Sequence, residues 1–449
     1  MRGLPTGVVV AAAMTLAAPA TLAQTSDQVL DANPASKAAD TQQQLNSRST
    51  LTGDWGGLRT RLSDGGVDLT AGYTSEAAAN VSGGDHHDAA ETGQFAFGAT
   101  VDMDKLVGLR GGTFQATITL RRGHDLDQTA GLGTLQQVQE VYGRGQTWRL
   151  TEFWYQQQFG NGIDLKAGRL TMSSDFGAFS CDFENLTFCG TPAGNIVGSY
   201  WYNSPVSQWG GRVRLKHTNW YLMAGVYESN PNNIRNNFTI SHGGAAGVTA
   251  PVEFGWTPKL GPNHLPGSYK IGAWYNSDNS SDVLVGADRR PFIVTGLEPL
   301  QHTGRFGANV LIQQQLTGRS VDDPKAGPTP THGLSVFFNI TQTDRQTSTT
   351  DNQIAAGLFY VGAVPGRPED DIGLAVGRTN VNGRAAFADV LRAPGTEKPD
   401  AEYASELYYS IHLRPWLILR PNVQYIVNPG GFHEATDVVV LGAKTAITF

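Results

Sequence analysis

The chain has 449 residues, a formal net charge of −7 and only two cysteines. This acidic balance argues against a nucleic-acid-binding protein, whose contact surface is usually basic. Hydrophobic residues make up 40% of the chain and the mean hydropathy is −0.27, values that are common in water-soluble proteins. They do not exclude a membrane barrel, because a strand that alternates lipid-facing and lumen-facing residues has a similar average.

Residues 1–23 have the features of a secretory signal peptide. Arg2 provides a positive charge, residues 8–18 form a short apolar stretch, and Thr21 and Ala23 are small residues at the two positions that a signal peptidase reads. We expect cleavage after Ala23, which removes Arg2 and changes the net charge from −7 to −8. The apolar stretch is too short to cross a bilayer as a helix.

Residues 24–66 are expected to form a polar N-terminal segment. Residues 24–50 are rich in Gln, Ser, Ala and Asp, which is typical of a flexible or weakly helical stretch. Asp54 then precedes a short helix with Leu58 and Leu62 on one face.

From Val67 onward the hydrophobic period changes to two, which predicts β-strands. Residues 93–104 illustrate the pattern, because apolar Phe95, Phe97 and Val101 alternate with small or polar residues. Sixteen segments of this kind occur, at about 67–81, 93–104, 112–122, 148–159, 163–172, 208–217, 219–228, 252–260, 267–277, 302–316, 331–343, 352–363, 371–380, 403–413, 416–427 and 437–449.

The connections between these segments alternate between very short and long. Short turns such as 160–162 on one side and long loops on the other are typical of outer-membrane barrels, whose long loops lie outside the cell. We therefore predict an all-β fold, a transmembrane antiparallel barrel over residues 67–449, with fourteen or eighteen strands as alternatives to sixteen. Phe449 lies in phase with Leu441 and Ala443. Outer-membrane barrels commonly end with such an aromatic residue, because their assembly machinery recognises the last strand.

The segment LTGDWGGLRTRLSDGGVDLTAGYTSE, from residue 51, resembles the N-terminal signature of carbohydrate-selective porins of the OprB type. The resemblance continues in GRLTMSSDFGAFSCDFENLTFCG, from residue 168, and covers the chain from about residue 50. It implies a sixteen-stranded barrel that passes glucose-like sugars by diffusion and has no enzymatic activity. It also implies a short N-terminal helical element inside or plugging the barrel, with Asp54, Trp55 and Arg59 as plug residues; plain solvation is the alternative for Arg59. The sequence departs from the family mainly in loops 125–147 and 229–251.

The connection at residues 173–207, which we call the constriction loop, follows the fifth predicted strand. In sixteen-stranded porins this loop commonly folds into the lumen. Its predicted eyelet residues are Asp175, Asp182, Glu184, Asn185 and Trp201. Cys181 and Cys189 are expected to form a disulfide that stiffens it, with two free thiols as the alternative; closing so small a ring stabilises by roughly 2.6 kcal/mol.

The lumen wall opposite the loop is predicted to be basic from strand phase. Its inward-facing cations are Arg212, Arg214, Lys216, Arg305, Arg420, Arg121 and Lys270. Arg169 is ambiguous: its strand phase points to lipid, whereas a bulge after Gly168 would turn it toward Asp175, as the Gly-Arg-Leu motif of the family favours. Charges across a narrow gap set up a transverse field and offer donors and acceptors to sugar hydroxyls. The alternative is a merely solvated pore wall.

The sequence lacks the motifs of several other functions. The sequence contains no phosphate-binding loop, dinucleotide fingerprint or HExxH motif, so no cofactor and no metal are predicted. A general diffusion porin without sugar preference, a barrel lipase and a secreted glycan-binding protein are the alternatives. The expected partners are small carbohydrates, outer-membrane lipid and lipopolysaccharide, in a monomer or a homotrimer.

Overall fold

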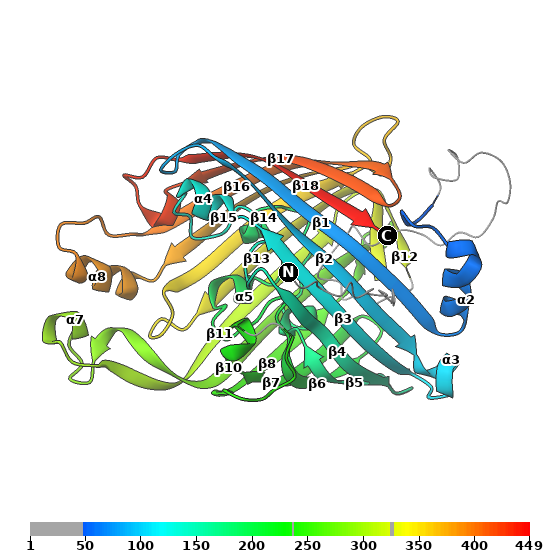
Figure 1. Cartoon of the computed structure of the whole chain (residues 1–449), viewed down its shortest axis with the longest axis horizontal. Helices are drawn as coiled ribbons and strands as arrows, with labels where there is room; N and C mark the ends of the chain where they lie inside the picture. Colours follow the sequence, from blue (N-terminus) through cyan, green and yellow to red (C-terminus); the bar gives the residue numbers. More distant parts are fainter. Residues whose placement is uncertain (1–47, 236–237, 324–326) are drawn as a thin grey trace, which may run out of the picture.

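The computed structural model of the chain describes residues 48–235, 238–323 and 327–449, and its strands form one antiparallel sheet that closes into a barrel (Figure 1). The strands are β1 (Val67–Ser82), β2 (Ala89–Asp102), β3 (Gly112–Gly123), β4 (Trp148–Gln158), β5 (Ile163–Leu170), β6 (Gln208–Lys216), β7 (Trp220–Ser229), β8 (Gly247–Trp256), β9 (Lys259–Leu260), β10 (Leu265–Gly286), β11 (Pro299–Gln315), β12 (Arg319–Asp323), β13 (Gly327–Thr343), β14 (Thr350–Val361), β15 (Asp371–Val381), β16 (Ala401–Arg414), β17 (Leu417–Val427) and β18 (Val438–Thr448).

The ring closes because β1 pairs with β2 on one side and with β18 on the other. Eighteen strands belong to the sheet, but β8 pairs directly with β10 and β11 directly with β13, so β9 and β12 are short additions outside the ring. Eighteen less two leaves sixteen strands in the barrel. The prediction of a sixteen-stranded antiparallel barrel is therefore confirmed.

The helices among the described residues are short; η2 and α2 precede β1, and the others lie in the connections between strands. They are η2 (Trp55–Gly57), α2 (Leu58–Asp64), α3 (Met103–Val107), α4 (Leu126–Ala130), η3 (Met172–Ser174), η4 (Leu186–Phe188), α5 (Pro192–Ile196), α6 (Asn232–Arg235), α7 (Phe292–Thr295), α8 (Gly383–Arg392) and η5 (Pro429–Gly431). Within the described residues, none of these helices has the length and apolar character needed to cross a membrane.

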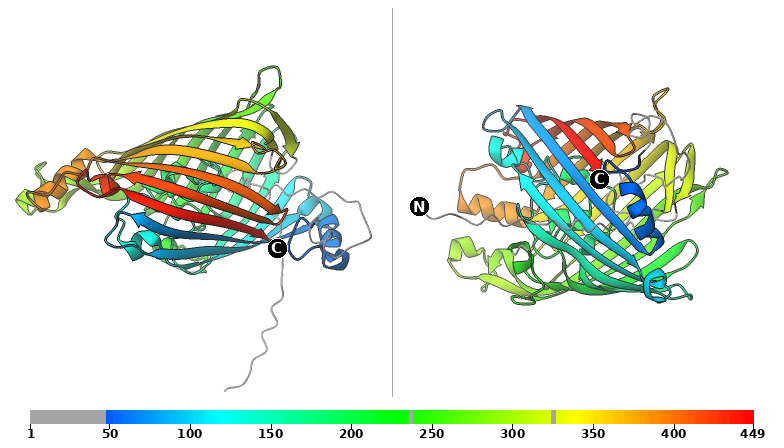
Figure 2. Two further views of the ribbon diagram at one scale, coloured as in Figure 1. Left: turned by 90° about the horizontal axis from the view of Figure 1, so that it is seen from above. Right: turned by 45° about the vertical axis from the view of Figure 1, so that its right-hand side comes forward.

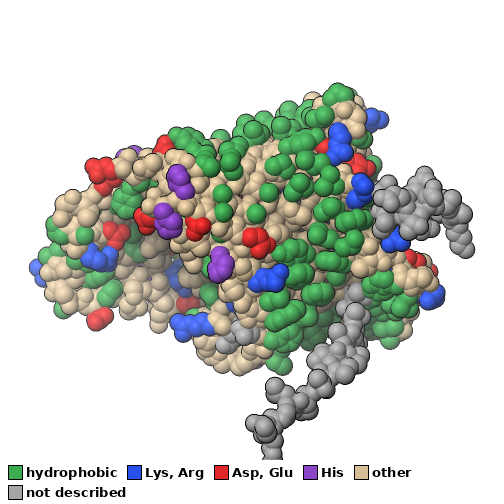
Figure 3. All heavy atoms as spheres, turned by 45° about the horizontal axis from the view of Figure 1, so that its top comes forward, with side chains coloured by type: hydrophobic (Ala, Val, Ile, Leu, Met, Phe, Trp, Pro, Cys, Tyr) green, Lys and Arg blue, Asp and Glu red, His purple; other side chains and the backbone are tan. Residues whose placement is uncertain are grey.

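The two faces of the sheet have opposite chemistry. On β6, Val213 is 44% exposed on the outer face, whereas its neighbour Arg212 is 5% exposed on the inner face. Ile271 and Tyr275 on β10 are likewise exposed, while Asn276 on the same strand is buried. Figure 3 shows hydrophobic side chains over a broad band of the outer face. This arrangement, apolar outside and polar inside, is that of a barrel whose solvent is lipid.

The N-terminal segment lies at the end of the barrel where the chain also ends, as the two views in Figure 2 show. Helix α2 packs against β1, and the backbone N–H of Leu51 donates to the carbonyl of Thr448 at 2.8 Å. Arg59 lies over the Trp55 ring and donates from Nη2 to the Phe449 oxygen at 2.8 Å.

These contacts place the predicted plug residues at the rim of the barrel rather than in its lumen. Asp54 accepts hydrogen bonds from Thr60 within the same short segment, so it stabilises the local turn. The plug prediction for Asp54, Trp55 and Arg59 is therefore wrong, because the segment is tied to the ends of β1 and β18. The predicted signal peptide and residues 24–47 lie outside the described residues.

Candidate functional site

The constriction loop crosses the lumen, because it contacts the inner face on both sides of the barrel. On one side, Asp175 pairs with Lys166 of β5 at 3.0 Å, and Gly177 donates its N–H to Glu253 of β8 at 2.6 Å. On the other side, Arg420 of β17 donates from Nη1 to the carbonyl of Asp182 at 2.7 Å. In Figure 1, α5 of this loop lies within the outline of the barrel.

An aromatic core fixes the loop in this position. Phe183 packs against Tyr408 of the wall with ring centroids 4.9 Å apart. Trp201 packs edge-on against Trp274, with centroids 5.1 Å apart, and is only 1% exposed. The eyelet prediction for Trp201 is wrong, because its ring is enclosed between the loop and the wall.

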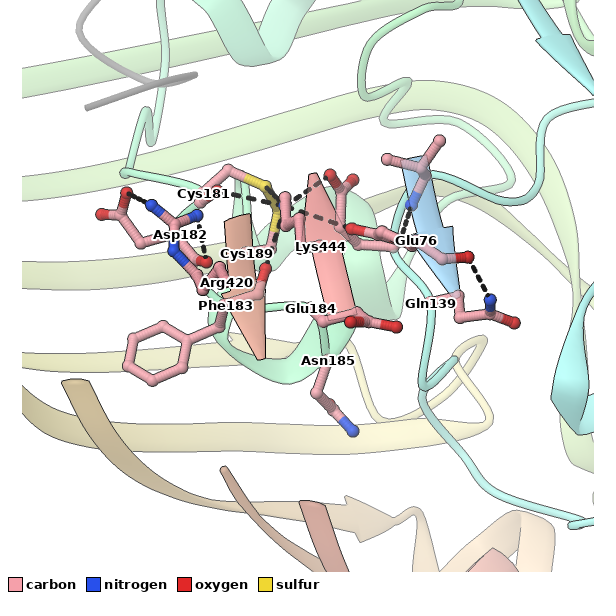
Figure 4. Close-up of polar contacts among 12 residues, drawn as sticks. Glu76, Gln139, Cys181, Asp182, Phe183, Glu184, Asn185, Cys189, Arg420 and Lys444 are labelled. Carbon is pink, nitrogen blue, oxygen red and sulfur yellow. Dashed lines mark hydrogen bonds and ion pairs between the residues drawn. A yellow bond between two sulfur atoms is a disulfide. The ribbon is translucent and has the colours of Figure 1, made fainter. Parts of the chain in front are cut away.

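The predicted disulfide is present, since Cys181 and Cys189 are joined. Lys444 of β18 reaches this part of the loop and donates from Nζ to the carbonyls of Cys181 and Phe183, at 3.2 and 3.0 Å (Figure 4). Between the two cysteines, the Asn185 side chain caps η4 by accepting from the N–H of Thr187. The covalent ring and the wall lysine thus hold the same short segment.

The acidic side chains of this segment face the wall and not the passage. Glu184 is fully buried, and its Oε2 accepts from Nδ2 of Asn422 at 2.6 Å. Asn185 donates to Gln424 at 2.9 Å, and Asp182 lies 3.6 Å from Arg420. The eyelet prediction is wrong for Asp182, Glu184 and Asn185, because buried carboxyl and amide groups need the polar partners that the lumen-facing strand residues supply.

Asp175 and Arg212 also belong to the attachment of the loop. Arg212 donates from Nε to Asp175 at 3.1 Å and from Nη1 to Asp164 at 2.6 Å, and both side chains are nearly closed to solvent. Burial opposes ionisation of Asp175, but Lys166 and Arg212 outweigh it and hold the pKa of Asp175 below its usual value. The predicted eyelet residues Asp175 and Arg212 therefore belong to a buried ion-pair cluster between the loop and the wall.

Arg169 has neither of its two predicted surroundings. Its guanidinium donates to Glu228 at 3.3 Å, to the Asn233 side chain at 3.3 Å and to the carbonyl of Ser207 at 2.7 Å. These partners lie near the end of β5: Ser207 directly precedes β6, Glu228 is on β7, and Asn233 belongs to the loop after β7, which covers this end. Arg169 is thus shielded from lipid without meeting Asp175, so the inward prediction is wrong.

The remaining predicted wall cations differ in how open they are. Arg420 is only 1% exposed and is held by Asp182 and Ser410, so it is a wall residue behind the loop. Arg305 pairs with Asp278 at 3.2 Å and lies over the Tyr200 ring. Arg214 pairs with Asp164, yet its side chain stays 30% exposed. Of these three, Arg214 is the most open, followed by Arg305. Lys270 donates from Nζ to the carbonyl of Ala178 in the constriction loop, and Lys216 is exposed at the end of β6.

A second loop, residues 124–147, also folds into the barrel, and the sequence did not reveal this. It pairs with the constriction loop through two backbone hydrogen bonds, from Glu140 N–H to Glu184 O and from Leu186 N–H to Gln137 O, each 2.9 Å long. The carboxylate of Glu402 on β16 accepts from the N–H of Leu135 at 2.6 Å.

One signal in the sequence of the second loop anticipates this burial. Leu132, Val138 and Val141 interrupt a polar stretch, and all three are buried. Together with Leu135 they make four large apolar residues among residues 132–141, more than a loop that faces only water is expected to carry. The signal is weak, because it says that the loop is covered but not by what.

The two loops leave a cavity of about 310 Å³ between them. This volume is at the lower end of the roughly 300–1,000 Å³ of small-molecule sites, a size suited to one small solute. Its lining consists of Arg121, Leu135, Gln137, Glu140, Tyr142, Gly143, Arg144, Leu186, Cys189, Gly190, Gly194, Asn195, Asn203 and Ser204.

A larger hollow of about 620 Å³ is lined by Leu165, Val213 and Val226 among others. These three side chains point outward from the barrel, so that hollow faces lipid and is not a candidate site.

The polar groups of the cavity are held in place by both loops. Arg121 donates from Nε to Gln94 at 2.8 Å and from Nη1 to the carbonyl of Tyr142 at 3.1 Å. Arg144 donates to the carbonyls of Gly198 and Gly194, at 2.9 and 3.1 Å. Donors and acceptors with such fixed positions are what recognition of a polyhydroxylated solute requires.

A closed barrel that is apolar outside, polar inside and narrowed by loops folded into it defines a diffusion channel of the Gram-negative outer membrane. The chain belongs to the carbohydrate-selective porin family, OprB type, whose family model matches residues 86–449. Members of this family are channels.

Individual relatives resemble the chain over nearly all of its length. Porin B of Pseudomonas aeruginosa is 40% identical over 420 residues, which is 89% of this chain and 91% of that protein. The high-pH structure of Pseudomonas putida OprB gives a TM-score of 0.84 at 39% identity and covers 90% of this chain and 99% of that chain. The low-pH structure gives a TM-score of 0.57 at 30% identity and covers 89% and 98%.

Proposed function

We propose that the chain passes small neutral carbohydrates of monosaccharide size across the outer membrane, and that the cavity between its two inward loops is the selective point. The observation that carries this proposal is the cavity of about 310 Å³, lined by amide, hydroxyl, guanidinium and carboxylate groups from both loops. Those groups can replace the water that a sugar loses. Each hydrogen bond to a sugar hydroxyl has a modest net strength, which allows release.

The proposal also includes the export of the chain, its insertion into the membrane and its oligomeric state. The chain has no catalytic role, is cleaved after Ala23 on export, and is inserted by machinery that reads the last strand with Phe449. Its outer band contacts lipid and lipopolysaccharide. Each chain contains a complete passage, so it conducts alone as a monomer and equally within a homotrimer.

Liposome swelling with a series of neutral solutes tests this function. We expect faster swelling with glucose and mannitol than with sucrose or maltose, and a steeper fall with size than a general porin gives. Equal dependence on size for sugars and for non-sugar solutes of matched mass would instead show a general diffusion porin.

A matched pair of variants tests the place of selection. Gln137→Trp puts a large ring into the cavity and should slow glucose several-fold, whereas Gln146→Trp places the same ring on an exposed position of the same loop and should leave the rate unchanged. If both variants conduct glucose like the unsubstituted protein, the cavity is not on the path.

A further inference from the structure

The cavity between the two loops has more positive charge than a neutral sugar requires. Arg121 and Arg144 both line it. Among the described residues, neither guanidinium has a carboxylate within ion-pair distance. Their hydrogen-bond acceptors are backbone carbonyls and the Gln94 amide, all of them neutral. Both side chains are thus fixed in position without a direct ion pair.

The acids near the cavity interact with Arg121, through the charges of Glu140 and Glu76, but not with Arg144. Glu140 is paired with Lys444, whose Nζ lies 3.1 Å from its Oε1. Lys444 also lies 3.1 Å from Glu76, so the lysine and two carboxylates form their own cluster behind the cavity. Burial and then the nearby Arg121 lower the pKa of Arg144, which reports that the two guanidiniums repel one another. An arginine nevertheless stays charged in proteins.

The backbone presents Arg144 in an unusual conformation. Its φ is +60°, in the left-handed region that non-glycine residues rarely occupy, and the flanking Gly143 and Gly145 also have positive φ. Arginine has no conformational preference for such a position. Its presence in that turn is accounted for by what its guanidinium faces, namely the cavity and the carbonyls of the constriction loop.

We infer that this cavity favours polyhydroxylated carboxylates, the sugar acids of the gluconate type, over neutral sugars of the same size. The inference rests on the proposed function, because it takes the cavity to lie on the permeation path. The carboxylate of such a solute would be held by Arg121 and Arg144. Its hydroxyls would meet the neutral polar groups of Gln137, Tyr142 and Asn195. Charge-assisted hydrogen bonds are roughly twice as strong as neutral ones, which makes the acid the preferred occupant.

The test is current block in planar lipid bilayers that hold the full-length mature protein. Gluconate and sorbitol serve as probes, because they share a six-carbon polyol chain and differ in the carboxylate. We expect gluconate to reduce the chloride current at a concentration about tenfold lower than sorbitol does, which corresponds to about 1.4 kcal/mol, because hydrogen bonds to a charged group are stronger than neutral ones. Equal blocking concentrations in the unsubstituted protein would overturn the inference.

Variants locate the effect. Arg144→Gln should abolish the preference for gluconate, Arg144→Lys should retain most of it, and Arg392→Gln, which removes a positive charge from the exposed helix α8, should leave it unchanged. If gluconate blocks the current through the Arg144→Gln variant at the same concentration as in the unsubstituted protein, the inference is overturned. Heat-modifiable mobility on a gel establishes that each variant is a folded barrel.

The outcome also separates this inference from the proposed function. Normal sugar selectivity in liposomes without any gluconate preference refutes the inference alone. If the unsubstituted protein shows no sugar selectivity in liposomes, the proposed function itself is refuted.

Discussion

Glu184 of the constriction loop has a carboxyl group that is buried against Asn422 of strand β17. Burial, and then the neighbouring carboxyls of Glu76 and Glu406, raise the pKa of Glu184 well above its usual value. An acid whose pKa is higher in the folded than in the unfolded state stabilises the fold below its unfolded pKa of about 4.3. That contribution is lost as the pH rises through the folded pKa.

The Glu184→Gln variant should therefore remove a pH dependence. The unsubstituted protein is expected to unfold at a higher temperature at pH 5 than at pH 8, and the variant should lose much of that difference by gaining stability at pH 8. Circular dichroism melting in detergent measures this. Glu369→Gln, on an exposed turn, serves as the control that keeps the difference. If Glu184→Gln destabilises the barrel at pH 8, the carboxyl is ionised there and the assignment fails.

Lys444 is the cation that connects the loops to the last strand. It pairs with Glu76 and Glu140 and donates to two carbonyls of the constriction loop. Lys444→Met should cost about 3–5 kcal/mol of unfolding free energy, because it leaves buried carboxylates without their counter-charge. Adding Glu76→Gln should recover part of that loss, which a double-mutant cycle in urea measures. Additive effects of the two substitutions would contradict the pairing.

At the scale of elements, the strands and the loops differ in how much of them the sequence predicts. A strand in a barrel has two environments, lipid and lumen, so the period of two in residues such as Val213 and Arg212 predicts both the strand and its orientation. A loop has no such period. The place of the constriction loop after the fifth strand predicts that it lies inside, and its two cysteines predict that it is covalently closed, but neither predicts which way Glu184 points.

The direction of the loop side chains depends on neighbours that are far away in sequence. Glu184 lies against Asn422, 238 residues further along the chain. The second loop adds to this difficulty, because it fills space that the constriction loop was expected to face. The acids predicted for the passage are consequently enclosed. Of the charged groups that do line the cavity, Arg121 was predicted to face the lumen, whereas Arg144 and Glu140 were not predicted.

The disulfide acts on the element that contains it. We expect the Cys181→Ser/Cys189→Ser variant to form a barrel of nearly unchanged melting temperature, because the strand pairings hold the wall. The loop, however, loses a closure worth roughly 2.6 kcal/mol. Discrimination between glucose and maltose in liposome swelling should fall several-fold. A reducing agent should have the same effect on the unsubstituted protein and none on the variant; unchanged discrimination in both would show that the wall contacts alone position the loop.

At the scale of the whole molecule, closure of the barrel brings the two ends of the described chain together. A closed barrel has no free strand edge, so β1 must pair with β18 across the full length of the sequence. Arg59 and Phe449, 390 residues apart, then meet beside this seam. The N-terminal segment therefore covers the end of the seam on the outside of the lumen, which explains why its conspicuous Trp55 and Arg59 do not narrow the passage.

Removing the Arg59 contact should loosen the end of the seam without opening the barrel. In Arg59→Ala, amide hydrogen exchange should become faster at Thr448 and Phe449, whose N–H groups donate to the carbonyls of Trp416 and Ala71. Exchange in the middle of β14, far around the ring, should not change.

Arg61→Ala, on the exposed face of the same helix, is the matched control and should leave the terminal amides as protected as before. Because a partly exposed hydrogen bond from a charged group contributes at most about 1.5–3 kcal/mol, the acceleration should stay within about a hundredfold. Equal exchange in the two variants would mean that strand pairing alone holds the end of the chain, and that the helix only lies beside it.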